Sequence, residues 1–254
     1  MNQTPEVPDE VVELARGARK LTVLTGAGMS AESGVPTFRD AQTGLWAEYD
    51  PAELATPEAW QRDRALVWAW YQWRRRLVTD CAPNPGHHAL AEWAALADLR
   101  IVTQNVDDLH ERAGSRVLGH LHGSLFEFRC DTCGQAVPAP ALPEVVQPGG
   151  RTEPPGCPGC DGHVRPGVVW FGEPLPQDQF NDGVDSVVES DLVLAVGSSG
   201  IVQPAALLPD MARRAGIPVV EINVEPTPLS DRANHVWLVP AGLGLSALVA
   251  NLTG

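Results

Sequence analysis

The sequence has little positive charge and no long apolar run, and both absences restrict what the protein can do. Of its 254 residues, 18 are Lys or Arg and 32 are Asp or Glu, giving a net charge of −14. A surface of this sign repels phosphate, so we expect no direct binding to nucleic acid or to an anionic membrane. No stretch of 18 apolar residues occurs, so no membrane-spanning helix is expected. Residues 1–10 lack the basic and apolar regions of a signal peptide, which favours a cytoplasmic protein.

Cysteine is also scarce, yet four of the five cysteines form a pattern. Cys130 and Cys133 make one Cys-x-x-Cys pair, Cys157 and Cys160 make a second, and 23 residues separate the pairs. In a reducing compartment this spacing predicts four thiolate ligands of one structural Zn²⁺ ion, with disulfides as the alternative. A catalytic zinc is not expected, because four thiolates leave no open coordination position. Cys81 is left over and is interpreted as a core thiol.

Short apolar runs alternate with helical patterns along the chain. We predict strands over residues 21–25, 100–104, 168–172, 191–197, 217–223 and 236–239. We predict helices over residues 9–20, 56–78, 84–99, 205–215 and 243–252. This alternation indicates an α/β fold with a doubly wound, parallel, Rossmann-like sheet.

Polar residues collect where the predicted strands end. Residues 26–31 follow the first strand and read Gly-x-Gly-x-x-Ala, the dinucleotide-binding turn. Its first glycine makes the turn, the second lets the backbone approach phosphate, and the small third residue lets the helix pack closely on the strand. Residues 104–107, 197–199 and 223–225 follow three other strands. We therefore expect four strand ends to meet at one ligand site.

The order of the motifs resembles that of the sirtuins, the NAD-dependent protein-lysine deacylases. The matching segments are residues 26–39, 103–107, 122–123, 168–173, 197–199 and 223–225, together with the four paired cysteines. The resemblance runs from about residue 21 to the C-terminus and implies NAD as co-substrate and one structural zinc ion. It implies a Rossmann-like NAD-binding domain formed by residues 1–40, 80–126 and 167–254. A small domain would be inserted, with a helical part, residues 41–79, and a zinc-binding part, residues 127–166.

The resemblance also implies roles for individual residues. His122 would be the general base, Asn105 would position the ribose and a water, and Asp107 would hold the nicotinamide carboxamide. A neutral imidazole suits removal of a proton from a ribose hydroxyl. His120 lies two residues away, but only His122 precedes the glycine of the motif. The residues implied to contact NAD are Gly26, Ala27, Gly28, Ser30, Ala31, Phe38, Arg39, Gln104, Asn105, Val106, Asp107, Gly197, Ser198, Ser199, Asn223, Glu225 and Ala241.

Substrates would be acylated lysines of proteins or peptides, and the products would be nicotinamide, free lysine and O-acyl-ADP-ribose. Tyr71 and Arg74 are spaced i, i+3 on one predicted helix face, as in the branch that accepts succinyl and malonyl groups. An arginine fork takes a carboxylate bidentately, and a tyrosine hydroxyl adds a donor. Acetyl-lysine needs no such partner and stays a candidate substrate. The residues implied to contact substrate are Ala55, Tyr71, Arg74, Val169, Phe171, Gly172, Glu173, Gly200 and Val202.

Several alternatives stay open at this stage. Tyr71 could pack on the tryptophans of its helix while Arg74 lies at the surface. Ser198 stands where many members of the family have Thr, and Gln203 stands where this branch often has Tyr.

The same NAD site could instead serve NAD hydrolysis, ADP-ribosyl transfer or hydride transfer, or belong to a non-catalytic NAD-sensing module. Retention of His122, Asn105 and Asp107 favours catalysis, and a peptide-pairing segment at residues 171–173 favours deacylation. A zinc module with a nicotinamide-releasing pocket is not needed for hydride transfer. The oligomeric state is open, with a monomer expected.

Overall fold

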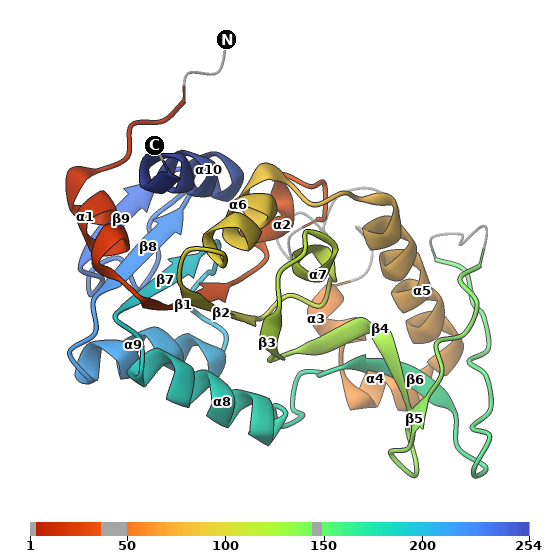
Figure 1. Cartoon of the computed structure of the whole chain (residues 1–254). Coiled ribbons are helices and arrows are strands. Elements are labelled where there is room, and N and C mark those ends of the chain that lie inside the picture. The colour runs from red at the N-terminus through yellow and green to blue at the C-terminus, as the bar shows by residue number, and fades with distance from the viewer. Residues whose placement is uncertain (1–3, 37–49, 144–148, 254) are drawn as a thin grey trace.

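A six-stranded parallel sheet forms the centre of the larger unit. The computed structural model describes residues 4–36, 50–143 and 149–253 (Figure 1). The strands are β1 (Lys20–Thr25), β2 (Asp98–Thr103), β3 (Val117–His120), β7 (Leu192–Val196), β8 (Val219–Asn223) and β9 (His235–Leu238). Their order is β3-β2-β1-β7-β8-β9, and every neighbouring pair is parallel. The order reverses between β1 and β7, where a doubly wound sheet opens a crevice. The predicted fold class is confirmed.

Helices cover both faces of this sheet (Figure 1). One face carries α1 (Asp9–Gly17), α6 (Pro85–Trp93) and α10 (Ala241–Thr253), and the other carries α8 (Gln177–Val188) and α9 (Leu208–Arg214), which follows the 3₁₀ turn Ala205–Leu207. Alternate side chains of β1 enter opposite cores, because strand side chains alternate in direction. Val23 packs in the α1/α6/α10 core and Leu24 in the α8/α9 core. Within the described ranges, no helix has the length and apolar character needed to cross a membrane.

The smaller unit has its own core. It contains α3 (Pro51–Leu54), α4 (Pro57–Arg62), α5 (Arg64–Asp80) and an antiparallel sheet of order β5-β4-β6. Those strands are β5 (Ala136–Val137), β4 (Gly123–Cys130) and β6 (Val164–Val168). Tryptophans of α4 and α5 pack on Leu125, Phe128 and Trp170 of the sheet side. Two short helices, α2 (Gly28–Ala31) and α7 (Leu109–Arg112), follow β1 and β2 and lead towards the junction of the two units (Figure 1).

Three helix predictions were wrong in their bounds. The helix predicted over residues 9–20 ends at Gly17, and β1 already begins at Lys20. The helix predicted over residues 56–78 is interrupted at Asp63, whose carboxylate accepts a hydrogen bond from the Leu66 amide and caps α5. A side-chain oxygen in this position satisfies an otherwise unpaired amide at the start of a helix. The helix predicted over residues 84–99 ends at Trp93, so β2 already begins at Asp98. The predicted start at Thr56 and Pro57 is confirmed.

The strand predicted over residues 168–172 was also wrong. β6 ends at Val168 and belongs to the antiparallel sheet. The following residues make single backbone hydrogen bonds to two separated segments: the Val169 amide donates to the His122 carbonyl, and the Phe171 amide donates to the Ala55 carbonyl, both at 2.8 Å. Residues 169–171 therefore join the two units instead of extending the large sheet. The sequence reading also missed β3, β4, β5, most of β6, α3, α7 and α8.

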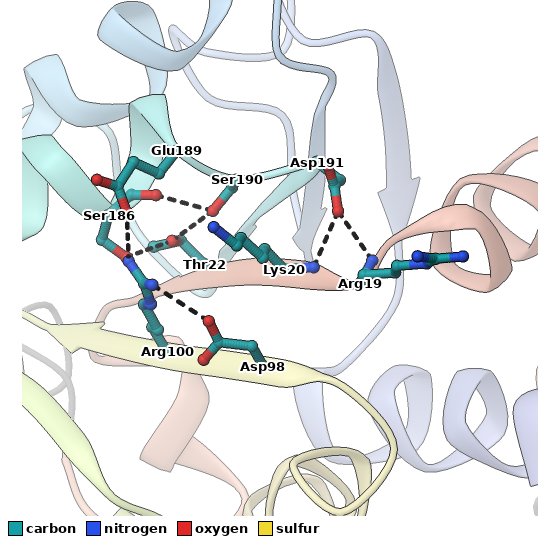
Figure 2. Close-up of polar contacts among 9 residues, drawn as sticks. All are labelled: Arg19, Lys20, Thr22, Asp98, Arg100, Ser186, Glu189, Ser190 and Asp191. Carbon is teal, nitrogen blue, oxygen red and sulfur yellow. Dashed lines mark hydrogen bonds and ion pairs between the residues drawn. The ribbon is translucent and has the colours of Figure 1, made fainter.

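A polar network lies at the amino-terminal ends of β1 and β2. Figure 2 shows its members, Arg19, Lys20, Thr22, Asp98, Arg100, Ser186, Glu189, Ser190 and Asp191. The Asp191 carboxylate accepts from the backbone amides of Arg19 and Lys20, both at 2.9 Å. The buried Thr22 hydroxyl bonds Ser190 at the end of α8, at 2.7 Å. These contacts hold α8 against the sheet at the edge opposite the predicted ligand site.

Candidate active site

The loops after β1 and β7 touch at the carboxyl edge of the sheet. The Gly28 amide donates to the Gly197 carbonyl at 2.8 Å. A Cβ at Gly26 would lie 2.7 Å from Ser198 Cα, and one at Gly28 would lie 2.7 Å from Gly197 Cα. Gly197 has φ 60, in the left-handed region. Glycine is therefore required at these positions so that the two loops can approach each other. This requirement comes from backbone packing and adds to the need for close approach to phosphate.

Polar side chains from three strand ends meet beside this contact. The Ser30 hydroxyl donates to Asp107 at 2.9 Å and accepts from the Asn105 amide at 3.2 Å. The Gln104 amide donates to the Ser198 hydroxyl at 3.1 Å. Burial raises the pKa of Asp107, although hydrogen bonds from Leu109 and Ser30 oppose this shift. Asp107 is thus a buried carboxyl group held in one orientation.

A cleft of about 470 Å³ lies between the two units. This volume is within the range of cofactor and ligand sites. The sheet side supplies the strand-end residues, and the small unit supplies residues of α5 and of the segment after β6. The lining includes Gly26, Ala27, Ser30, Ala55, Tyr71, Arg74, Gln104, Asn105, Val106, Asp107, His122, Val169, Phe171, Gly172, Glu173, Gly197, Ser198, Ser199 and Val202.

His122 and His120 have opposite electrostatic environments. Burial lowers the pKa of His122, and a hydrogen bond with the Gln104 backbone only partly opposes it. Its Nε2 atom is buried and has no hydrogen-bond partner within the described part of the chain. His120 instead bonds Glu111 at 2.7 Å and the Asn105 carbonyl at 3.1 Å. Burial acts to lower the pKa of His120, but Glu111 outweighs it, so that pKa is raised. His122 is therefore the neutral imidazole that faces the cleft.

The α5 side of the cleft carries a tyrosine and an arginine. Tyr71 is 3% exposed, and its hydroxyl accepts a hydrogen bond from Trp170 Nε1 at 3.0 Å. Burial raises the pKa of Tyr71 to about 12, and the charge of Arg74 opposes this rise. The Arg74 guanidinium lies over the Trp70 ring, 4.9 Å from its centroid. Both side chains line the cleft, so Arg74 is not merely a surface residue.

A buried ion pair supports the segment after β6. The Arg165 guanidinium contacts both carboxylate oxygens of Glu173, at 2.6 and 2.9 Å, and donates to the Val168 carbonyl at 3.0 Å. It lies 3.2 Å from the centroid of the Trp170 ring. Glu173 also accepts from the Trp170 amide at 2.9 Å. Trp170 is thus held from its backbone and from one ring face.

The four predicted metal ligands form one cluster. The sulfur atoms of Cys130, Cys133, Cys157 and Cys160 all lie within 4.8 Å of one another. The Cys130–Cys160 and Cys133–Cys157 sulfur distances are 3.5 and 3.9 Å. Tetrahedral Zn²⁺ with bonds of about 2.3 Å places its sulfurs about 3.8 Å apart. Backbone amides also donate to three of the sulfurs, which suits thiolates. The donor set therefore fits one structural Zn²⁺ ion.

Some predicted residues do not line the cleft. Asn223 is absent from the lining, and its side-chain amide donates to the Ser198 carbonyl at 2.9 Å. Ala241 is buried at the start of α10. The other predicted residues absent from the lining are Gly28, Ala31, Gly200 and Glu225. Phe38 and Arg39 fall outside the described residues.

Sequence reasoning assigned no role to several aromatic and apolar residues of the cleft. These include Val35, Trp70, Trp73, Leu125, Trp170 and Ile201. Val35 and Trp170 carried a signal, since each stands inside one of the quoted motifs.

Comparison with known proteins agrees with this geometry. The model of the Sir2 family matches residues 26–204. NAD-dependent protein deacylase 1 of Pseudomonas aeruginosa is 55% identical over 242 residues, which cover 94% of this chain and 96% of the relative. NAD-dependent protein deacylase Sir2 of Mycolicibacterium smegmatis is 57% identical over 233 residues, covering 92% and 96%.

Solved structures show the same fold. A Sir2 homolog in complex with NAD superposes with a TM-score of 0.88 at 41% identity, covering 100% of this chain and 96% of that one. A Sir2 protein bound to an acetylated peptide has a TM-score of 0.79 at 26% identity, covering 95% and 96%. The family match, the sequence identities and the shared fold agree, and the chain belongs to the Sir2 family, the sirtuins.

Proposed function

We propose that this chain, among the NAD-dependent protein deacylases of its family, removes acidic acyl groups such as succinyl and malonyl from lysine side chains. One observation carries the proposal: Tyr71 and Arg74 line the same cleft as His122. A carboxylate accepts hydrogen bonds only, and an arginine fork beside a tyrosine hydroxyl supplies donors and positive charge. Ala55 leaves space on the same side of the cleft for the longer acyl chain. Acetyl-lysine fits the same cleft without using the charge.

The sheet side of the cleft would bind NAD. The loops after β1 and β7 would contact the pyrophosphate with the backbone amides of Ala27, Ser198 and Ser199, because the amides of their glycines already donate to protein carbonyls. The buried Asp107, held by Ser30, would accept from the nicotinamide carboxamide. NAD, when bound, supplies the ribose carbon that takes the acyl oxygen and the ADP-ribose that leaves with the acyl group.

His122 would act as the general base. Its lowered pKa keeps it neutral near pH 7, so Nε2 can accept a proton from a ribose hydroxyl. Asn105, which bonds Ser30, would hold the ribose and a water nearby. The products would be nicotinamide, free lysine and O-acyl-ADP-ribose.

The peptide would lie between two segments of the cleft wall. Residues 171–173 and residues 200–202 would each pair with the substrate backbone, as an added strand does. Phe171 and Ile201 are 45% and 63% exposed, which is unusual for large apolar side chains and suits a surface that a peptide covers. The zinc thiolates require a reducing compartment, which favours the cytoplasm.

NAD hydrolysis and ADP-ribosyl transfer on the same scaffold are the competing functions. They use the NAD side of the cleft but need neither an acyl-lysine channel nor a carboxylate partner. Arg74 in the cleft lining favours deacylation, because it places a positive charge where an acidic acyl group would lie.

The test is a comparison of three peptides of one sequence that carry succinyl-, malonyl- or acetyl-lysine, incubated with NAD and followed by mass spectrometry. We expect succinyl loss with O-succinyl-ADP-ribose formed. Arg74→Met should lower the succinyl-to-acetyl ratio of kcat/KM roughly tenfold to a hundredfold, since a charge-assisted hydrogen bond is lost. Arg76→Met is the matched control, because Arg76 lies on the same helix but is exposed and pairs with Asp80.

Three outcomes decide the matter. Acetyl loss alone would keep the family chemistry and reject the acidic preference. Equal ratios in the Arg74 and Arg76 variants would reject Arg74 as the carboxylate partner. NAD consumed to free ADP-ribose, with every acyl group retained, would assign the protein to the hydrolase function.

A further inference from the structure

Trp170 lies beside the tyrosine of the acyl side and bonds its hydroxyl. The indole Nε1 donates to Tyr71 Oη at 3.0 Å, and the two rings stack with centroids 6.5 Å apart. The two residues are 2% and 3% exposed, and both line the cleft. No sequence pattern indicates that these two residues act together. The contact matters because an indole nitrogen can only donate a hydrogen bond, whereas a phenol can donate or accept.

Trp170 cannot turn this donor elsewhere. One face of its ring meets the Arg165 guanidinium, and the Trp60 ring packs against it with centroids 5.5 Å apart. Its backbone amide bonds Glu173 at 2.9 Å. Trp60 is itself held by a bond from its indole to Asp131, beside the first zinc thiolate, at 2.9 Å. Contacts from the ring faces and the backbone thus keep the Trp170 N–H directed at the Tyr71 oxygen.

A fixed donor on one side of a phenol oxygen sets the direction of the phenol proton. The proton of a phenol prefers the plane of the ring, which leaves two directions for it. The Trp170 N–H occupies the acceptor position on one side, so the Tyr71 proton must point to the other. The pKa of about 12, raised by burial, means that this proton is retained at neutral pH. Tyr71 is therefore a permanent donor on the side away from the indole.

We propose that Trp170 is a positioning residue for acyl selectivity, which orients the Tyr71 hydroxyl as a hydrogen-bond donor to the carboxylate of the bound acyl group. The inference rests on the proposed function, since it concerns the same acyl site. It adds a reason why the site prefers a carboxylate to a neutral group of the same size. A group that can only accept meets a hydroxyl that can only donate. Without Trp170 the hydroxyl would be able to serve either kind of ligand.

The test compares two substrates that differ only at the end of the acyl chain. Butyryl-lysine carries a methyl group where succinyl-lysine carries its carboxylate, so the succinyl-to-butyryl ratio of kcat/KM measures recognition of that group. The ratio is measured for the wild-type protein, Trp170→Phe, Tyr71→Phe and the double variant. Phenylalanine keeps an aromatic ring at position 170 and removes the N–H. Thermal unfolding of each variant shows that it is folded.

We expect Trp170→Phe to lower the ratio roughly threefold, and Tyr71→Phe roughly tenfold, as the loss of an oriented and of a charge-assisted hydrogen bond. In the Tyr71→Phe background, Trp170→Phe should change the ratio no further, because the hydroxyl that it orients is absent. A purely structural role would instead lower the ratio, or both rates, equally in the two backgrounds.

The outcomes distinguish failure of the positioning role from failure of the proposed function. If Tyr71→Phe lowers the ratio and Trp170→Phe does not, the positioning role is overturned and the proposed function stands. Equal effects of Trp170→Phe with and without the hydroxyl also overturn it. If Tyr71→Phe leaves this ratio unchanged and Arg74→Met leaves the succinyl-to-acetyl ratio unchanged, the acidic-acyl function fails and the positioning role fails with it.

Discussion

Glu173→Gln should weaken the fold through a buried charge and leave the shape of the site almost intact. Gln has the size of Glu and can still accept one hydrogen bond, so the substitution mainly removes the negative charge. The Arg165 side chain that faces it is 7% exposed. Loss of one partner of a buried pair leaves the other charge uncompensated, which costs about 3–5 kcal/mol. The Glu173 side chain is still 19% exposed, so we expect the lower end, about 3 kcal/mol.

This free energy corresponds to a fall in Tm of about 6–12 °C for a chain of this length. Glu173 forms a second ion pair, with Arg129 at 3.4 Å. This pair adds little to the free energy of unfolding, because the Arg129 side chain is 42% exposed. The double variant Glu173→Gln/Arg165→Met should recover part of the loss. Methionine has no charge to desolvate and fills the space against the Trp170 ring. The comparison therefore separates the charge from the packing.

The assay is urea unfolding of the wild-type protein, the single variant and the double variant, with Tm measured in parallel. Burial acts to raise the pKa of Glu173, but hydrogen bonds from Arg165 outweigh it and lower the pKa. A carboxylate with a lowered pKa stabilises the fold above its unfolded value of about 4.5, and this contribution is lost as the pH falls below it. The difference between wild type and Glu173→Gln should therefore shrink below pH 4.5. A single variant that loses less than about 1 kcal/mol, or a double variant less stable than the single one, would refute the reasoning.

Three further predictions concern the base, the zinc cluster and the opposite edge of the sheet. With His122 as the proposed base, its lowered pKa should place the acid limb of kcat/KM below the usual histidine value of about 6.5; a limb above pH 6.5 would contradict this role. Cys157→Ser should abolish stoichiometric zinc binding, measured by metal analysis, and lower Tm, since structural zinc contributes to folding. Asp191→Ala removes the acceptor of two backbone amides far from the cleft, so Tm should fall while kcat/KM stays at the wild-type value; a comparable loss of kcat/KM would show that this edge is coupled to the cleft.

The inner strands β1, β7 and β8 of the parallel sheet were predictable because they are buried on both faces. β7 is buried at every position, so it reads as a continuous apolar run with a glycine after it. Where strands and helices alternate along the chain, such a run indicates a strand of a parallel sheet. The antiparallel sheet gave no such signal. β4 alternates exposed and buried residues only in part, since its pairing with β6 contains an irregularity between Ser124 and Phe128. A strand with a broken alternation lacks the period on which prediction depends.

The same distinction applies to the cleft. The strand-end residues were predictable because a parallel sheet brings all its carboxyl ends to one edge. The structure brings Ser30, Asn105 and Asp107 into one hydrogen-bonded group, as the pattern indicates. The bond between Trp170 and Tyr71 joins residues 99 positions apart, one in the segment after β6 and the other in α5. No local sequence period indicates such a contact, so it could be identified only from the three-dimensional structure.

The two sides of the cleft come from units with separate cores, and this separation bears on how selectivity can vary. The side proposed to bind NAD is built from loops in which glycine is required by backbone contact, as at Gly26 and Gly197. A substitution there disturbs the approach of two strands, so this side tolerates little change. The side proposed to bind the acyl group includes Tyr71 and Arg74 of α5, which line the cleft with their side chains. Under the proposed function, we therefore expect the accepted acyl group to vary through residues of α5 and through Trp170, while His122 keeps its proposed role as base.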